Sequence, residues 1–213
     1  MSARTALMQH MLRTALLLGL FAIIGTGLVA YTFKATEQPI AESQRAALLR
    51  SLHALVPPAL HDNDLFTDII EVSDGRLGSA KPMRVFRARQ KQQPVAIVIE
   101  TIAPDGYNGN IHLLVAIKHN GELLGVRVSQ HRETPGLGDA IDVDRSDWIQ
   151  GFVGRSLDNP SANGWRVKKD GGDFDQFTGA TISPRAVVKA VFRVLQYYRE
   201  QGEALFVKEV EDD

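Results

Sequence analysis

The chain has 213 residues, enough for one soluble domain with an appendage. Its formal net charge is −1, and the basic residues form no run or aromatic-studded stripe, which excludes a nucleic-acid-binding protein. Cysteine is absent, which excludes thiolate iron–sulfur ligands, c-type haem attachment and thiol catalysis by this chain. Any redox chemistry therefore depends on a cofactor that needs no thiols.

The first predicted element is an apolar helix near the N-terminus. Residues 14–33 contain no acidic, basic or histidine side chain, and at about 1.5 Å per residue they span roughly 30 Å, the thickness of a bilayer core. Arg4 and Arg13 precede this segment, so the positive-inside rule predicts a cytoplasmic N-terminus and an outer location for everything after Lys34. The alternative is a cleaved signal peptide, whose apolar region is usually shorter, roughly 7–15 residues. We expect a retained signal anchor.

A further helix and five strands are predicted beyond the anchor. Residues 38–53 have apolar side chains at helical spacing and are followed by Pro57-Pro58, which ends the helix. Branched apolar residues predict strands at residues 67–72, 83–88, 95–102, 111–117 and 123–128. Turn signals lie at residues 104–109 and at Asn120-Gly121, the preferred two-residue hairpin turn. An antiparallel sheet flanked by helices fits this order and gives an α+β domain.

We divide the chain into four parts on this pattern. They are a cytoplasmic stub with the transmembrane anchor at residues 1–34, a linker and helical segment at 35–80, the sheet domain at 81–205 and a charged tail at 206–213. Residues after Glu200 become charged, so we expect the end of the chain to be frayed.

An acidic stretch at residues 139–147 could bind a hard cation. It lacks the ordered Gly and terminal Glu of a calcium loop, which favours a solvated acidic surface. Ser146 is expected to cap a short helix that carries Trp148 and Phe152. The histidines show no paired spacing on one helix face, so we expect no metal site.

A loop of small residues follows the strand predicted at 123–128. The sequence His131-Arg132-Glu133-Thr134-Pro135-Gly136-Leu137-Gly138 contains Pro-Gly and a second Gly, which predict a sharp turn with exposed backbone. A flat ring could approach such a turn closely. From these residues alone, a plain surface loop is the alternative.

The last predicted helix begins after a second loop of small residues. Pro184 suits the first helical position, because its missing N–H is unused there, and Ser183 is expected to be the N-cap. Apolar residues then recur at helical spacing as far as Tyr198. Thr181 would lie about two residues before the helix, where free N–H groups and the helix dipole favour a phosphate. An ordinary capped helix start is the alternative.

Three sequence blocks together resemble a family of covalent FMN-binding domains. Asp175-x-x-Thr178-Gly179-Ala180-Thr181 looks like the D-x-x-[ST]-G-A-[ST] sequence at which flavin transferases attach FMN to the last hydroxyl. Residues 131–138 resemble the H-x-E-T-P-G-L-G signature of the same family, and Gly106-Tyr107-x-Gly109 matches it upstream. The blocks occur in the order and spacing found in Rnf G subunits and in the related Na⁺-NQR C subunits. With the anchor helix they cover nearly the whole chain, and Thr178 stands where Ser is frequent.

This resemblance implies that Thr181 carries FMN through a phosphoester that a flavin transferase installs, with Asp175 serving that installation step. It implies a flavin site that also includes Tyr107, His131, Glu133, Thr134, Pro135, Gly136, Leu137, Gly138, Thr178, Gly179, Ala180 and Ile182. Backbone N–H groups of residues 134–138 would face the ring, with Leu137 and Ile182 as packing partners. His131 would either orient its loop or donate to the flavin.

The resemblance also implies an electron-transfer subunit of an ion-translocating redox complex in the bacterial inner membrane. The anchor would hold the flavin domain on the periplasmic face beside other membrane subunits. We expect no independent catalytic activity, and no triad or carboxylate pair for hydrolysis is evident. Two alternatives remain open: a membrane-tethered structural or assembly subunit without a working flavin, and an extracytoplasmic flavin reductase that acts on a soluble acceptor.

Overall fold

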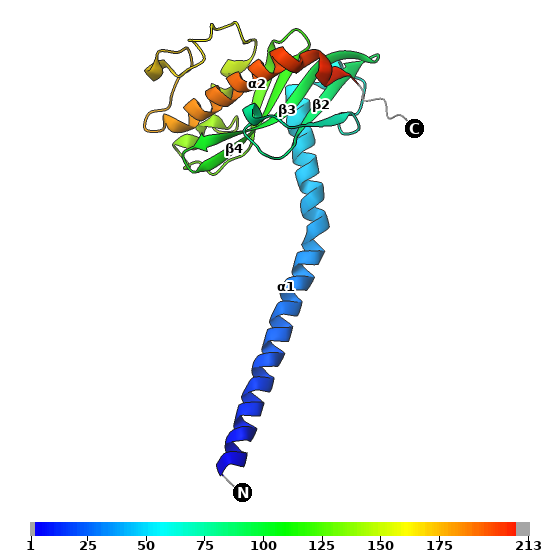
Figure 1. The fold of residues 1–213 in the computed structure, drawn as a ribbon, viewed down its shortest axis with the longest axis vertical. Coiled ribbons are helices and arrows are strands. Elements are labelled where there is room, and N and C mark those ends of the chain that lie inside the picture. Colours follow the sequence, from blue (N-terminus) through cyan, green and yellow to red (C-terminus); the bar gives the residue numbers. More distant parts are fainter. Residues whose placement is uncertain (1–2, 208–213) are drawn as a thin grey trace. The chain divides into compact units, whose positions relative to one another are not determined.

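The computed structural model describes residues 3–207. Helix α1, Ala3–Leu55, is continuous and contains Pro39 (Figure 1). No non-helical linker separates the expected anchor from the helix predicted at 38–53, because both belong to α1. A proline inside a helix removes one backbone hydrogen bond, and the neighbouring residues can still continue the helix on both sides. Contacts divide the chain into two units after Leu48, inside α1.

The N-terminal unit consists of the greater part of α1. Within residues 3–207, one helix is long and apolar enough to cross a membrane. Its candidate span is Leu7–Leu55, the most apolar window of that span has a mean hydropathy of 2.1, and no part of this window is buried. The apolar N-terminal helix expected from the sequence is therefore present.

The second unit is built on a five-stranded antiparallel sheet with the strand order β1-β2-β3-β4-β5 (Figure 1). The strands are β1 Ile69–Val72, β2 Met83–Gln90, β3 Gln93–Gly106, β4 Gly109–Lys118 and β5 Leu123–Gln130. All five predicted strands are present and each is hydrogen-bonded to its neighbour in sequence. The expected α+β architecture is confirmed, because helices pack against this antiparallel sheet.

The two hairpin turns predicted from the sequence differ in kind. Tyr107 and Asn108 alone connect β3 to β4, since Gly106 pairs with Gly109. The β4–β5 turn is not the predicted two-residue turn. Its loop has three residues, because the Lys118 N–H donates to the carbonyl of Glu122 and the Gly121 N–H donates to the carbonyl of Lys118. Gly121 has φ +86°, the left-handed residue that completes a three-residue hairpin loop.

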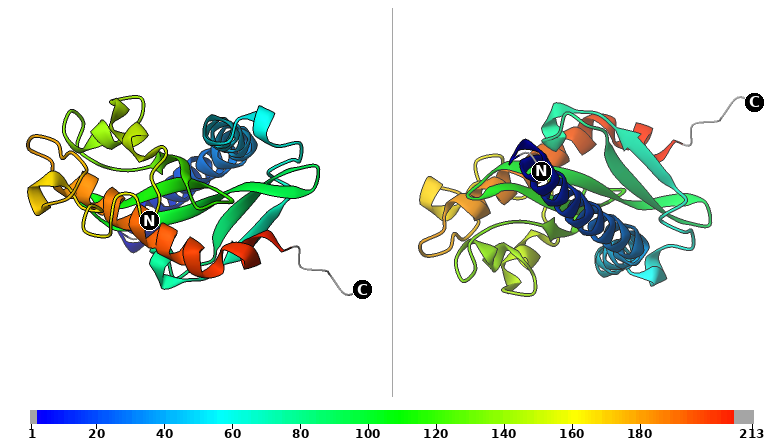
Figure 2. Two further views of the ribbon diagram at one scale, coloured as in Figure 1. Left: turned by 90° about the horizontal axis from the view of Figure 1, so that it is seen from above. Right: turned by 90° about the horizontal axis from the view of Figure 1, so that it is seen from below.

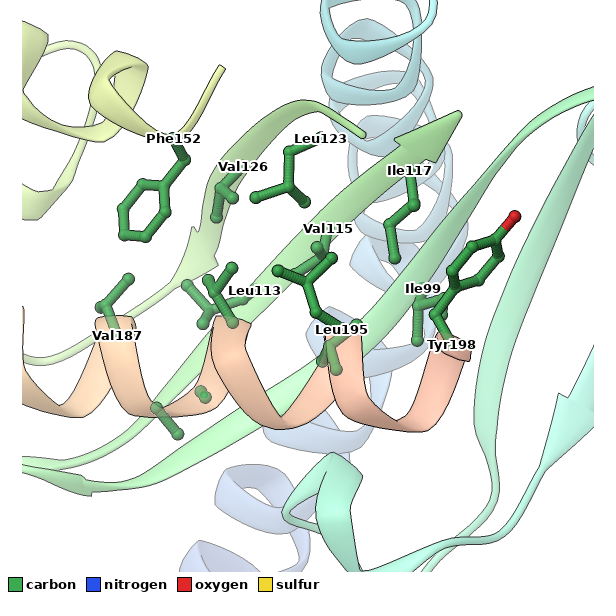
Figure 3. Close-up of a cluster of buried hydrophobic side chains, with 14 of the residues drawn as sticks. Ile99, Leu113, Val115, Ile117, Leu123, Val126, Phe152, Val187, Leu195 and Tyr198 are labelled. Atoms are coloured by element: carbon green, nitrogen blue, oxygen red, sulfur yellow. The ribbon is translucent and has the colours of Figure 1, made fainter. Parts of the chain in front are cut away.

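Helix α2, Ile182–Phe206, covers one face of the sheet. Figure 3 shows Val187, Leu195 and Tyr198 of α2 turned toward branched side chains of β3, β4 and β5. Short 3₁₀ helices connect the remaining segments: η1 Pro58–Leu60, η2 Gly75–Leu77, η3 Gly138–Ile141, η4 Asp147–Phe152 and η5 Lys168–Asp170. The cap predicted for the short helix is present in η4, where the Ser146 hydroxyl accepts from the Trp148 N–H.

The C-terminal part of α2 is ordered and packed, contrary to the frayed end expected after Glu200. Leu205 and Phe206 are buried, and the helix continues to Phe206. The expectation failed because the charged residues of this segment occupy only the outer face of the helix, while the apolar ones reach the core. The remainder of the predicted tail, residues 208–213, lies outside the described residues.

The end of α1 packs against part of the opposite face of the sheet (Figure 2). Leu52, Leu55 and Val56 are buried there, and the Leu55 side chain lies against Gly125 of β5, where an added Cβ would come within 3.0 Å of it. The sheet residues buried on this side are Phe86, Ala88, Ala96, Val98, Leu114 and Ala116. The last residues of α1 are therefore part of the sheet domain.

Leu52→Ala is expected to lower the free energy of unfolding of the sheet domain by about 2–5 kcal/mol, because it leaves a cavity at a fully buried position. Leu28→Ala is the matched control, since Leu28 lies in the same helix with 65% of its surface exposed. Denaturant unfolding of the full chain in detergent measures the free energy of unfolding of both variants. Equal stabilities for the two variants would contradict the packing described for the end of α1.

Candidate functional site

The segment before α2 is a tight turn that requires glycine. The Ala180 N–H donates to the carbonyl of Phe177 at 3.1 Å, and Gly179 has φ +82°. Only glycine adopts this left-handed conformation at little cost at the third position of such a turn. The turn leaves Thr178 and Gly179 exposed and brings Thr181 directly to the start of α2.

The start of α2 differs from the sequence-based expectation. The helix begins at Ile182, Thr181 is the N-cap, and Pro184 is the third helical residue, where its missing N–H is still harmless. Thr181 has helical dihedral angles, φ −77° and ψ −24°, and its side chain makes no capping hydrogen bond. Among the described residues, no acceptor faces the N–H groups of Ile182 and Ser183. Donors at this helix terminus therefore remain available beside the Thr181 hydroxyl.

The predicted cap, Ser183, has another partner. Its hydroxyl donates to Oε2 of Glu133 at 2.5 Å, and both residues are buried. Oε1 of the same carboxyl accepts from the Asn108 N–H at 3.2 Å. One carboxyl group therefore joins the β3–β4 turn, the loop after β5 and the first turn of α2. The sequence around Ser183 does not predict this contact, because Glu133 lies 50 residues away along the chain.

The loop after β5 folds around a single carbonyl oxygen. The carbonyl of Thr134 accepts from the N–H groups of Leu137, Gly138 and Asp139 at 3.1, 3.1 and 3.4 Å. The N–H groups of Leu137 and Gly138 are thus used inside the loop, which contradicts the expectation that they face a ring. The Thr134 hydroxyl accepts from Nδ2 of Asn108 at 3.3 Å, a second link to the β3–β4 turn.

A cavity of about 270 Å³ lies where these segments meet. Its lining residues are Tyr107, Glu133, Thr134, Leu137, Gly138, Gly179, Ala180, Thr181, Ile182 and Ser183. Tyr107, Leu137 and Ile182 have exposed fractions of 65%, 44% and 42%, so the mouth has an apolar rim. The three sequence blocks, far apart along the chain, therefore form one pocket.

Five of the predicted site residues do not line this cavity: His131, Pro135, Gly136, Asp175 and Thr178. Nδ1 of His131 accepts from the Glu133 N–H at 3.1 Å, and its Nε2 lies 3.9 Å from Asp142. The imidazole is therefore hydrogen-bonded to the backbone of its own loop. Asp175 is exposed and pairs with Lys168 at 2.6 Å on the outer surface.

Two supporting residues were not assigned to the site from the sequence. Trp148 in η4 donates from Nε1 to the carbonyl of Asp175 at 2.8 Å, and its ring packs edge-on against Phe177. Lys189, two turns into α2, pairs with Asp105 at the end of β3 at 2.7 Å, and this hydrogen bond lowers the pKa of the Asp105 carboxyl. The contacts of Trp148 with residues 175–177 could not be predicted from the sequence, because only the fold brings these segments together.

Comparisons with known proteins match both parts of the chain. The FMN-binding domain family matches residues 106–196, and the RnfG N-terminal region matches residues 1–55. The chain is 49% identical to the G subunit of an ion-translocating oxidoreductase complex from Vibrio cholerae, over 91% of this chain and 92% of that protein. It is 50% identical to a protein of that description from Pseudomonas aeruginosa, over 94% of each chain. A Shewanella baltica relative is 49% identical over 92% of this chain and 93% of its own. The chain therefore belongs to the G subunits of the Rnf-type ion-translocating oxidoreductase complex, and it is an FMN-binding electron-transport protein.

Proposed function

We propose that this subunit carries FMN as a phosphoester on Thr181 and passes electrons between other subunits of the complex. The observation that carries the proposal is the position of Thr181. Thr181 occupies the N-cap position of α2. Its side chain makes no capping hydrogen bond, and the residue lines the cavity formed by the three sequence blocks. Other subunits of the complex are its partners, and the proposal adds a flavin transferase during maturation.

The helix terminus fits a phosphate group. The N–H groups of Ile182 and Ser183 have no acceptor among residues 3–207, and the dipole of the 25-residue helix α2 places partial positive charge at this end. A phosphate on the Thr181 oxygen would supply the acceptors that a capping side chain normally provides. The proposed phosphate would therefore take the place of the side-chain cap that this helix lacks.

The cavity fits one end of a flat aromatic ring system. Leu137 and Ile182 offer apolar surface to the pocket, and Tyr107 extends from the two-residue turn between β3 and β4. These three side chains are partly exposed, so a ring bound here would remain accessible to a partner subunit. Apolar walls with few polar groups are usual for cofactor sites.

Attachment requires one group transfer at Thr181. The hydroxyl oxygen forms a bond to the FMN phosphorus of FAD, the pyrophosphate bond to AMP breaks, and the hydroxyl proton is lost as AMP leaves. The added mass is that of FMN less one water. The Thr181 oxygen is then occupied, so it takes no part in later electron transfer.

When bound, FMN supplies the electron-accepting and electron-donating chemistry that this cysteine-free chain lacks. The residues of the chain hold the ring in place and exclude water from the face that lies against Leu137 and Ile182. A covalent link prevents loss of the cofactor by diffusion, which suits a domain on the outer side of the membrane. We propose that location, with a cytoplasmic N-terminus, because Arg4 and Arg13 precede the apolar part of α1.

Intact-mass measurement of the protein purified from membranes of cells that contain the transferase tests the attachment. The expected result is a mass increase of FMN less one water, located on the peptide that contains Thr181, with flavin fluorescence that survives denaturing electrophoresis. A native preparation with neither the added mass nor the fluorescence would overturn the proposal.

A further inference from the structure

Glu133 is a buried carboxyl group without a cationic partner among the described residues. Its side chain is 4% exposed, and its two oxygens accept from the Asn108 N–H and the Ser183 hydroxyl. Burying a carboxyl group is unfavourable unless hydrogen bonds compensate for the lost water, so the fold retains this group at a cost. Simple packing would be served equally well by an apolar side chain of similar volume.

Two glycines leave room for this carboxyl group. A Cβ added at Gly106 would come within 2.9 Å of Oε1, and one added at Gly138 would come within 2.9 Å of Oε2 and 2.6 Å of the Ser183 hydroxyl oxygen. Both glycines have ordinary negative φ angles, so backbone conformation does not require them. At Gly138 the atoms closest to an added Cβ belong to Ser183 and Glu133, so close approach to this carboxyl group requires glycine there. At Gly106 the closest atom is the carbonyl oxygen of Gly109 at 2.2 Å, and the carboxyl oxygen is the next.

Ser183 connects this carboxyl group to the proposed attachment site. It is the second residue of α2, two positions after Thr181, so its position sets the position of the first helical turn. Within residues 3–207, the Thr181 side chain makes no capping bond and the Ile182 N–H has no partner, so neither group anchors that turn. The Glu133–Ser183 hydrogen bond is therefore the buried polar contact that fixes the start of α2 against the rest of the pocket, whereas the ion pair of Arg185 with Asp170 at 2.6 Å holds the same turn on the exposed surface.

We propose that Glu133 is a positioning residue for flavin attachment: through Ser183 it holds the first turn of α2 so that the Thr181 hydroxyl is presented to the transferase in one orientation. This inference rests on the proposed function of Thr181. The carboxyl group itself touches neither the transferred phosphate nor Thr181 in this role. Its positioning role depends on its two hydrogen bonds and not on its charge.

Two substitutions separate hydrogen bonding from charge. Glu133→Gln keeps the side-chain length, and its amide can accept from the Asn108 N–H through oxygen while its NH₂ group donates to the Ser183 oxygen, since a hydroxyl both accepts and donates. Glu133→Ala removes both bonds and leaves the Asn108 N–H and the Ser183 hydroxyl without them. Ser183→Ala removes only the connection to α2.

The experiment measures the initial rate of flavin transfer to the full-length protein in detergent, with purified transferase and FAD, as a function of acceptor concentration. Glu133→Ala and Ser183→Ala are expected to lower kcat/KM, by up to about 100-fold for a displaced acceptor group, and the double variant should lose little more than Glu133→Ala, because the two residues act as a unit. Glu133→Gln is expected to retain most of the wild-type rate. The unfolding midpoint of every variant is measured in parallel.

Leu52→Ala is the control for lost stability, since Leu52 packs on the opposite face of the sheet and does not line the cavity. The proposal is overturned if Glu133→Ala accepts flavin at the wild-type rate, if Glu133→Gln is as slow as Glu133→Ala, or if Leu52→Ala is slowed to a similar extent. If the wild-type chain accepts no flavin, the proposed function of Thr181 fails instead, so the two failures are distinguishable.

Discussion

Thr181→Val is expected to abolish covalent flavin attachment while leaving the fold intact. Valine has the same branched shape as threonine and lacks only the hydroxyl that would form the ester. Because the Thr181 side chain makes no capping hydrogen bond, stability should change by less than about 0.5 kcal/mol. Denaturing electrophoresis with flavin fluorescence, together with intact mass, measures the attachment, and far-ultraviolet circular dichroism checks the fold.

Thr181→Ser is the matched control for this experiment. It changes the same residue but keeps a hydroxyl, and the sequence that this block resembles has Ser or Thr at that position. It is expected to retain the flavin. Loss of flavin from both variants would show that the block is sensitive to any substitution and would remove Thr181 as the assigned acceptor.

Electron flux through the complex, measured in membranes of the Thr181→Val strain, separates the functional alternatives. An electron carrier predicts loss of flux with normal assembly of the complex. Unchanged flux would favour a structural or assembly subunit. An independent flavin reductase predicts instead that the flavin-loaded protein, purified away from the other subunits, reduces a small soluble acceptor. We expect no such activity, and its detection would favour the reductase.

Asp68→Ala is expected to destabilise the sheet domain by about 3–5 kcal/mol, because it leaves two buried arginines without their common partner. Asp68 bonds to Arg87 at 2.5 Å and to Arg89 at 2.7 Å, and the exposed fractions of the three residues are 7%, 4% and 9%. A loss of this size is a large fraction of the total stability of a typical domain. Denaturant unfolding measures it.

The same cluster holds the end of α2. Nη1 of Arg87 donates to the carbonyl of Val207, and Nη2 of Arg89 donates to the carbonyl of Phe206. These bonds satisfy carbonyl groups at the C-terminus of the helix and place positive charge where the helix dipole is negative. Asp68→Ala should therefore also increase hydrogen exchange in the last turn of α2.

Glu100→Ala is the control for the Asp68 prediction. Glu100 pairs with Arg84 at 2.6 Å on a partly exposed surface, where the Arg84 side chain is 42% exposed. Exposed ion pairs contribute about 1 kcal/mol or less, so this variant should unfold close to the wild type. Similar losses for Glu100→Ala and Asp68→Ala would contradict the interpretation of Asp68 as the centre of a buried cluster.

Local pattern was sufficient for the strands and for the apolar helix near the N-terminus. Branched residues in short runs predicted all five strands, because strand formation depends on side chains that alternate or cluster over a few positions. Errors arose at boundaries. The Asn120-Gly121 turn gained a third loop residue, and α2 began two residues earlier than Pro184 suggested. At both places two conformations satisfy the local preferences, and contacts with other segments select one.

The sequence by itself determined the architecture, since helices and strands depend on residue types at short spacing, and its resemblance to covalent FMN-binding domains implied the three blocks of the site and the hydroxyl proposed to accept FMN. Only the tertiary structure decided that the end of α1 packs against the sheet, that Ser183 bonds to Glu133 instead of capping its helix, and that His131 bonds to the backbone of its own loop. Each of these contacts depends on how the chain is folded around it, and hydrophobic periodicity and turn preferences contain no information about which distant groups will meet.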